Sequence, residues 1–227
     1  MDQVYNTRRA LVIGASGGIG QAVATALEAR GTDVTRLSRR VDGFDITDEA
    51  SVAHHLDLLD GSYDAILIAT GGLTPAGGAP EKALGQISAP ALSAQFALNA
   101  IGPALVLKHA PRLLPRDRRA FVAALSARVG SIGDNRLGGW YGYRAAKAAL
   151  NQIVHTAAIE LARSHRQAIC VALHPGTVQT ALTASYLGRH PAVAPQTAAE
   201  NLLAVLDGLG PADTGGFFDW AGKRVAW

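Results

Sequence analysis

The chain has 227 residues, of which 48% are hydrophobic, 17% charged and 6% aromatic, and its formal net charge is +3. This length is typical of one domain with a sizeable core, so we expect a single domain over residues 1–227. The basic residues lie in short clusters with few aromatic residues between them, which argues against a nucleic-acid-binding face.

Targeting and redox signals give a second set of expectations. The N-terminal segment MDQVYNTRRALVIG lacks the apolar stretch of a secretory signal. We also find no uncharged apolar run of about 18 residues, the length needed to span a membrane. Cys170 is the only cysteine, so no internal disulfide is possible. We therefore expect a cytoplasmic protein with no membrane partner.

Short apolar runs alternate with helical patterns along the chain. The strands that we expect cover residues 10–13, 33–37, 63–69, 120–126, 169–174 and 217–220. The helices that we expect cover residues 21–30, 49–59, 91–109, 141–162 and 198–206, the third with a kink at Gly102 and Pro103. The strands lack period-two alternation, as expected when helices cover both faces of a parallel sheet. The pattern predicts a doubly wound, Rossmann-type α/β domain with a mostly parallel sheet.

The first strand leads directly into GASGGIG, residues 14–20, and a helix follows. Backbone amides in such a turn, together with the helix dipole, bind a pyrophosphate. The glycine spacing is longer than GxGxxG, and no Lys-Ser/Thr pair follows, which excludes a Walker-type loop. We therefore expect a dinucleotide in this turn, bound by Gly14, Ser16, Gly18, Ile19 and Gly20.

The end of the second strand indicates which dinucleotide binds. It reads TRLSRR, residues 35–40, and contains no carboxylate for the ribose 2′-OH. Because arginine pairs with a 2′-phosphate, Ser38 and Arg39 favour NADP(H). NAD(H) remains possible if Arg39 and Arg40 are exposed turn residues and Asp42 contacts the ribose.

The stretch GGWYGYRAAKAALNQ places two tyrosines and a lysine on the helix expected over residues 141–162. Tyr143 and Lys147 are four residues apart and share a helix face, whereas Tyr141 points elsewhere. A free phenol has a pKa of about 10, and a nearby ammonium stabilises the phenolate and lowers that pKa. The pair predicts that Tyr143 exchanges a proton with a carbonyl oxygen. Lys147 also has donors for a ribose.

The glycine turn and the segment from Tyr143 to Lys147 together resemble the short-chain dehydrogenase/reductase superfamily over nearly the whole chain. The stretch LSARVGSIGDNRLGGWYGYRAAKAALNQ and the ending FFDWAGKRVAW are similar to its C-factor-like branch. The resemblance implies that Tyr143 is the catalytic acid and base, and that Lys147 lowers its pKa and binds the nicotinamide ribose. It also implies that Asn99, in FALNAIG, relays protons through water to the lysine.

The resemblance further implies a serine that polarises the substrate carbonyl. Ser126 ends the strand AFVAALS, and Ser131 lies five residues later. We favour Ser126, because a strand end is more rigid than a loop.

Three more segments complete the expected cofactor site. After a later strand, HPGTVQT resembles the family turn that passes the nicotinamide, and the matching residues are Pro175, Gly176, Val178 and Thr180. The family usually has an Asn-Asn-Ala-Gly-like motif where this chain has ATGG, and the residues expected to pack against the adenosine ribose are Ala69, Thr70 and Gly71. Asp45 and Ile46 lie where a following loop flanks the adenine. Because the asparagines are missing, we expect a looser ATGG turn than is usual in the family.

Other chemistries lack their motifs. No HxxxH or CxxC spacing exists, so we expect no metal, and no GxSxG elbow indicates a hydrolase. The expected function is NADP(H)-dependent hydride transfer that interconverts a carbonyl and an alcohol on a small molecule. The alternative is a dinucleotide-binding signalling or sensor protein of the C-factor type with little or no turnover.

The remaining expectations concern the substrate pocket and assembly. The walls of the substrate pocket should come from the loops near 71–90, 127–140 and 180–195, the last of which could act as a lid. The small residues along the helix at 141–162 suit oligomer contacts, and related proteins often pair through long helices. We therefore expect a homodimer or homotetramer.

Overall fold

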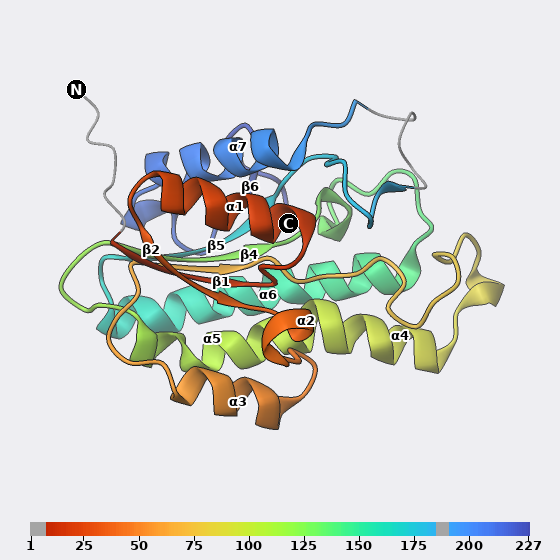
Figure 1. Cartoon of the computed structure of the whole chain (residues 1–227). Helices are drawn as coiled ribbons and strands as arrows, with labels where there is room; N and C mark the ends of the chain where they lie inside the picture. Colours follow the sequence, from red (N-terminus) through yellow and green to blue (C-terminus); the bar gives the residue numbers. More distant parts are fainter. Residues whose placement is uncertain (1–7, 185–190) are drawn as a thin grey trace.

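A computed structural model describes residues 8–184 and 191–227. In this part of the chain six strands form one sheet in the order β2-β1-β3-β4-β5-β6, and every neighbouring pair is parallel (Figure 1). The strands are β1 (Arg9–Ile13), β2 (Asp33–Leu37), β3 (Ala65–Ile68), β4 (Ala120–Leu125), β5 (Ala168–His174) and β6 (Phe217–Asp219). All six overlap the strands expected from the sequence.

Helices cover both faces of this sheet (Figure 1). On one face lie α1 (Gly18–Ala29) and α7 (Pro195–Gly208). On the other face lie α3 (Glu49–Asp57), α5 (Gly102–Leu113) and α6 (Tyr141–Ser164). Two further helices are α2 (Arg39–Asp42) and α4 (Ala89–Phe96). This arrangement confirms the doubly wound, Rossmann-type α/β fold.

The central strands are buried on both faces, which explains their unbroken apolar sequences. Along β4, Val122 and Ala124 belong to the core under α5 and α6, whereas Phe121 and Ala123 belong to the core under α1 and α7. Successive side chains therefore alternate between two cores although both sets are apolar.

The order of the strands also locates the expected cofactor site. β1 pairs with β2 on one side and with β3 on the other, so the chain reverses its direction across the sheet between β1 and β3. Ligands of open α/β sheets bind at such a switch point, outside the carboxyl ends of the strands. The glycine turn after β1 and the ATGG segment after β3 both lie at this edge.

The helix expected over 91–109 is more complex than a kinked helix. A π-helical turn, Ala97–Ile101, joins α4 to α5. Pro103 has no N–H to donate to the carbonyl of Asn99 four residues earlier, and this loss accompanies the wider turn. Gly102 packs against Ile46, where a Cβ would lie 2.8 Å from the Ile46 carbonyl oxygen. The π-turn places Asn99 in the interior, where it is fully buried.

The same stretch corrects one expectation. Ala89–Leu113 is long and apolar enough to cross a membrane by length and composition alone, although we expected no such run. Its polar residues Gln95 and Asn99 are buried within the fold, and α5 packs against α3 and α6. A core helix of an α/β protein passes the same test, so the stretch is weak evidence for a membrane span.

Candidate active site

The glycine-rich turn after β1 packs closely against its surroundings. Gly14 has a φ of 85°, and a Cβ there would lie 2.9 Å from the backbone carbonyl of Ala69. A Cβ on Gly20 would overlap the carbonyl oxygen of Gly14. No side chain fits at either position, so the first turn of α1 can approach the end of β1 as a phosphate-binding turn requires.

The polar groups around this turn fit a dinucleotide. No side chain caps the N-terminus of α1, so the backbone N–H groups of Gly18, Ile19 and Gly20 are available to an anion. The hydroxyl of Thr70 is buried and has no partner in the described part of the chain. Ser16 is exposed in the turn. These donors suit the pyrophosphate and an adjacent ribose.

The short helix α2 begins just after β2 ends, and it was not predicted from the sequence. Ser38 caps it, since its hydroxyl accepts from the N–H of Val41 at 3.4 Å. The carboxylate of Asp42 accepts from the backbone N–H and the hydroxyl of Ser38 at 2.8 and 3.0 Å. Arg39 and Arg40 are exposed. Asp42 is thus already engaged within α2, while the positive charges face solvent beside the end of β2.

Asp45 and Ile46 follow α2 with their side chains already placed. The carboxylate of Asp45 accepts from the N–H and hydroxyl of Thr47 at 2.9 and 2.7 Å, and these bonds lower its pKa. The side chain of Ile46 is buried in the core. Any contact from Ile46 to an adenine would therefore come from its backbone.

Three predicted residues meet beyond the end of β3. A Cβ on Gly71 would lie 3.0 Å from Oδ1 of Asn99 and 3.4 Å from Nζ of Lys147. The Asn99 amide donates to the carbonyl of Gly72 at 2.9 Å and accepts from its N–H at 3.1 Å. This pair of bonds holds the ATGG segment although the asparagines of the family motif are missing.

Tyr143 lines a cavity of about 770 Å³. One turn along the same face of α6, Nζ of Lys147 lies 5.9 Å from the centre of the Tyr143 ring and donates to the carbonyl of Leu125 at 2.8 Å. All three expected walls contribute: Leu73 from the first loop, Ala127 to Trp140 from the second, and Leu182 with Thr183 from the third. Residues 185–190 of the third loop lie outside the described residues.

The pKa expected for Tyr143 is wrong in direction. Burial raises the pKa of the Tyr143 phenol to about 12, and burial lowers the pKa of the Lys147 ammonium to about 7. Removal from water opposes charge on both groups, and burial is the cause of both shifts. The phenol is consequently protonated at neutral pH, the form that donates a proton to a carbonyl oxygen.

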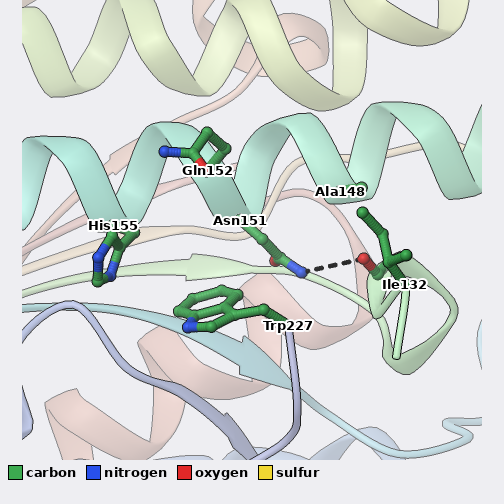
Figure 2. Close-up of a pocket in the computed structure, with 7 residues that line it drawn as sticks. Ile132, Ala148, Asn151, Gln152, His155 and Trp227 are labelled. Atoms are coloured by element: carbon green, nitrogen blue, oxygen red, sulfur yellow. Dashed lines mark hydrogen bonds between the residues drawn. The ribbon is translucent and has the colours of Figure 1, made fainter. Parts of the chain in front are cut away.

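Neither candidate serine lies on the Tyr143 cavity. The hydroxyl of Ser126 donates to Oδ1 of Asn151 at 2.6 Å. Figure 2 shows the next bond, in which the Asn151 amide donates to the carbonyl of Gly130 at 3.4 Å. Ser131 accepts from the N–H of Asp134 at 3.1 Å and is also buried. The residue on the cavity wall is Ala127. The geometry does not support the carbonyl-polarising role expected for Ser126.

Figure 2 shows the surroundings of Asn151, the residue that accepts the hydrogen bond from Ser126. A smaller cavity of about 260 Å³ is lined by Asn151, Gln152 and His155 of α6 together with Ile132 and Trp227, and Figure 2 shows Asn151 and His155 on either side of the Trp227 ring. Ser126 is thus directed toward the packing between α6 and the C-terminal segment, away from Tyr143.

The HPGTVQT segment lies beside the glycine turn, as expected. A Cβ on Gly18 would lie 2.8 Å from the methyl group of Thr180. Gly176 has a φ of 78° and lines the Tyr143 cavity, and a Cβ there would lie 3.0 Å from the Trp220 ring. Val178 is buried and forms a bridge to Val193, and Pro175 is half-buried. The segment therefore joins the cofactor groove to the cavity.

Among the cavity residues to which the sequence analysis assigned no role are Trp140, Arg144 and His174. Burial lowers the pKa of His174 to about 4, so the imidazole is neutral, and its Nδ1 is buried without a partner in the described part of the chain. The HPG sequence was a signal for His174, but nothing in the sequence indicated which way the ring points. Among residues 8–184 and 191–227, no cluster of three His, Cys, Asp or Glu side chains could hold a metal.

Comparison with known families agrees with this geometry. A family model described as enoyl-(acyl carrier protein) reductase matches residues 14–205, from the glycine turn to α7. The chain belongs to the short-chain dehydrogenase/reductase superfamily. This is a superfamily of oxidoreductases. The resemblance to its C-factor-like branch is supported by a C-signal protein of Myxococcus xanthus, which is 35% identical over 64% of this chain and 84% of that protein.

Two further relatives, and one more solved structure that shares the fold, cover nearly the whole chain. A 1-hydroxy-2-glutathionyl-2-methyl-3-butene dehydrogenase of Rhodococcus sp. (strain AD45) is 30% identical over 96% of this chain and 98% of that protein. A short-chain dehydrogenase/reductase from Burkholderia multivorans, solved with bound NADP, is 26% identical and superposes with a TM-score of 0.81 over 97% of this chain and 100% of that chain. The carbonyl reductase Sniffer of D. melanogaster shares the fold, with a TM-score of 0.82 over 97% of this chain and 99% of that chain, at 20% identity.

Proposed function

We propose that the chain is an NADP(H)-dependent oxidoreductase that interconverts a carbonyl and an alcohol on a small molecule, with Tyr143 as proton donor and acceptor. One observation carries the proposal. Tyr143 lines the large cavity, and one turn away Lys147 lies beside Gly71, which Asn99 also approaches from the π-helical turn. The cavity for a substrate and the groove for a dinucleotide therefore meet at one face of α6.

The side chains have distinct roles in this proposal. A bound nicotinamide supplies the hydride for reduction. Tyr143 donates a hydrogen bond to the substrate oxygen and then its proton, because burial keeps the phenol protonated. Lys147, with a pKa of about 7, changes charge readily at neutral pH and with Asn99 links the phenol to solvent. Since Ser126 points toward Asn151, Tyr143 is also the group that polarises the carbonyl.

The preference for NADP(H) rests on charge at the end of β2. Arg39 and Arg40 are exposed, while the carboxylate of Asp42 is bonded to Ser38. A 2′-phosphate is favoured by the arginines, whereas a ribose 2′-OH would find no free carboxylate there. The related Burkholderia protein with bound NADP supports the same preference.

The test is Tyr143→Phe, with Tyr141→Phe as the matched control on the same helix. Wild-type protein and both variants are screened with NADPH and NADH against aldehydes, ketones, quinones and an enoyl thioester, the last because of the matched family's description. We expect Tyr143→Phe to lose carbonyl reduction while its NADPH affinity, measured by calorimetry, stays nearly unchanged. Retained reduction by this variant would show that Tyr143 is not the proton donor.

A second candidate function is a dinucleotide-binding signalling or sensor protein. Two observations favour it: no serine hydroxyl lines the Tyr143 cavity in the described part of the chain, and a C-signal protein is among the relatives. Wild-type protein that binds NADPH tightly and reduces nothing in the panel would support this function over the enzyme.

We also propose a homodimer or homotetramer. Ala149, Ile153 and Ala157 lie four residues apart along α6 and remain partly exposed, although Ile153 and Ala157 also pack against the core of the same chain. Light scattering of the purified protein measures the mass directly. A monomer at micromolar concentration would contradict this part of the proposal.

A further inference from the structure

The backbone at Trp140 has a conformation that a bulky residue rarely adopts. With φ of 53° and ψ of 42°, Trp140 is the one non-glycine residue with positive φ in residues 8–184 and 191–227. Gly138 and Gly139 before it have φ values of 63° and 65°. Left-handed geometry costs conformational energy in any residue with a Cβ, and glycine or asparagine normally occupies such positions.

Several hydrogen bonds hold this left-handed segment in place. The N–H of Trp140 donates to the carbonyl of Glu81 at 2.5 Å, and a carboxylate oxygen of Glu81 accepts from the N–H of Gly142 at 3.3 Å. The guanidinium of Arg144 donates to three backbone carbonyls, those of Val129, Gly138 and Gly139. The start of α6 and the loop before it therefore fix the position of the indole from both sides.

The strained position directs the ring into the substrate cavity. Trp140 lines the cavity together with Tyr143, and the two ring centres lie 6.3 Å apart in an edge-to-face arrangement. The cavity lining includes the apolar residues Leu73, Val129, Leu137 and Leu182, and the charged residues Arg128, Asp134, Arg136 and Arg144 also contribute to it. Backbone strain that the surrounding structure maintains is concentrated at functional sites.

We propose that Trp140 determines substrate specificity: its indole forms the wall that accepts an aromatic or bulky apolar group attached to the reacting carbonyl carbon. This inference rests on the proposed function, because it assigns the substrate class of the same cavity. The ring lies beside the phenol that donates the proton, so an aryl group packed on Trp140 brings its carbonyl to Tyr143.

The expected preference is measured with benzaldehyde and propanal as substrates and NADPH as reductant. Wild-type protein should favour benzaldehyde, and in both Trp140→Gly and Trp140→Ala the kcat/KM for benzaldehyde should fall by about tenfold, mainly through KM. The kcat/KM for propanal should stay within about threefold. Trp140→Phe should keep most of the preference, and Tyr141→Ala, outside the cavity lining, should leave it unchanged. An unaltered benzaldehyde-to-propanal ratio in the Gly and Ala variants would overturn the proposal.

The same pair of variants tests the strain. Both remove the indole, but glycine adopts the left-handed conformation without the Cβ penalty. We expect Trp140→Gly to melt about 2–4 °C above Trp140→Ala, the reverse of the usual order. An Ala variant as stable as the Gly variant would show that residue 140 is not held in this conformation.

Binding separates this inference from the proposed function. Benzyl alcohol is titrated calorimetrically into each variant in the presence of NADPH, a measurement that needs no turnover. The affinity should fall by at least about fivefold in Trp140→Gly and remain near wild type in Tyr141→Ala. If wild-type protein reduces nothing in the panel of carbonyl compounds named above but shows this loss, the enzyme proposal fails and the aromatic wall stands. Equal affinities in wild type and Trp140→Gly would refute the wall.

Discussion

Replacing Lys147 by methionine should make the stability of the protein respond to pH in a defined way. The pKa of the buried ammonium is about 7, against 10.5 for a free lysine side chain. Because the folded pKa is depressed, the unfolded chain binds more protons between pH 7 and 10.5, so this group makes wild-type stability rise with pH in that window. Methionine at position 147 does not titrate and removes that rise.

The size of the effect follows from the two pKa values. A tenfold change in a proton-binding equilibrium is about 1.4 kcal/mol, so keeping Lys147 buried costs about 4 kcal/mol at pH 7 and about 2 kcal/mol at pH 9. The substitution also removes the donor to the Leu125 carbonyl, a loss of about 1–3 kcal/mol that does not depend on pH. The stability advantage of Lys147→Met over wild type should therefore shrink by about 2 kcal/mol from pH 7 to pH 9.

The assay is urea unfolding of the cofactor-free protein at pH 7 and pH 9 for wild type, Lys147→Met and the control Lys108→Met. Lys108 is exposed, and its bond to Glu49 raises its pKa, so it stays charged in both states over this range. The control should show no comparable trend. If the difference between wild type and Lys147→Met is the same at both pH values, the ammonium is not desolvated as the structure indicates, and the role of Lys147 near neutral pH must be abandoned.

Three other substitutions test separate parts of the site. Arg39→Glu should raise the KM for NADPH by about tenfold and leave the KM for NADH nearly unchanged, as measured by steady-state kinetics. Equal effects on both cofactors would show that Arg39 does not bind the 2′-phosphate. Ser126→Ala should keep kcat within about threefold but lower the free energy of unfolding by about 1–3 kcal/mol, because Oδ1 of Asn151 loses its donor; a large fall in kcat would restore Ser126 to the chemistry. Gly18→Ala should weaken NADPH binding by about tenfold in calorimetry, because its Cβ would lie 2.8 Å from the Thr180 methyl group, and unchanged affinity would place the cofactor elsewhere.

The fold was predictable because its signals are local. Each strand is a short apolar run, each helix has a 3.6-residue pattern, and their alternation leaves parallel strands as the simplest topology. The position of Tyr143 relative to Lys147 was predictable for the same reason, since helix geometry alone places residues four apart on one face. The phosphate-binding role of the glycine turn was predicted because the turn comes directly after the first strand and before a helix.

Properties that depend on tertiary surroundings were not predictable. The pKa of Tyr143 was expected to fall because Lys147 is near, yet burial, which no local pattern specifies, raises it to about 12. The left-handed Trp140 depends on Glu81, about sixty positions earlier in the chain. The π-turn at Asn99 combines a local cause, Pro103, with packing of Gly102 against Ile46.

The case of Ser126 shows why a buried parallel strand conceals the direction of its side chains. Val122 and Ala124 face α6, so two residues later Ser126 also faces α6, and its N–H continues the sheet by donating to the carbonyl of Leu173. Ala127 then faces the cavity. In a half-exposed strand, polar residues would reveal this alternation, but β4 is apolar on both faces and gives no such sign. The cavity therefore receives a methyl group where a hydroxyl was expected, and proton donation to the substrate oxygen depends on Tyr143 of α6.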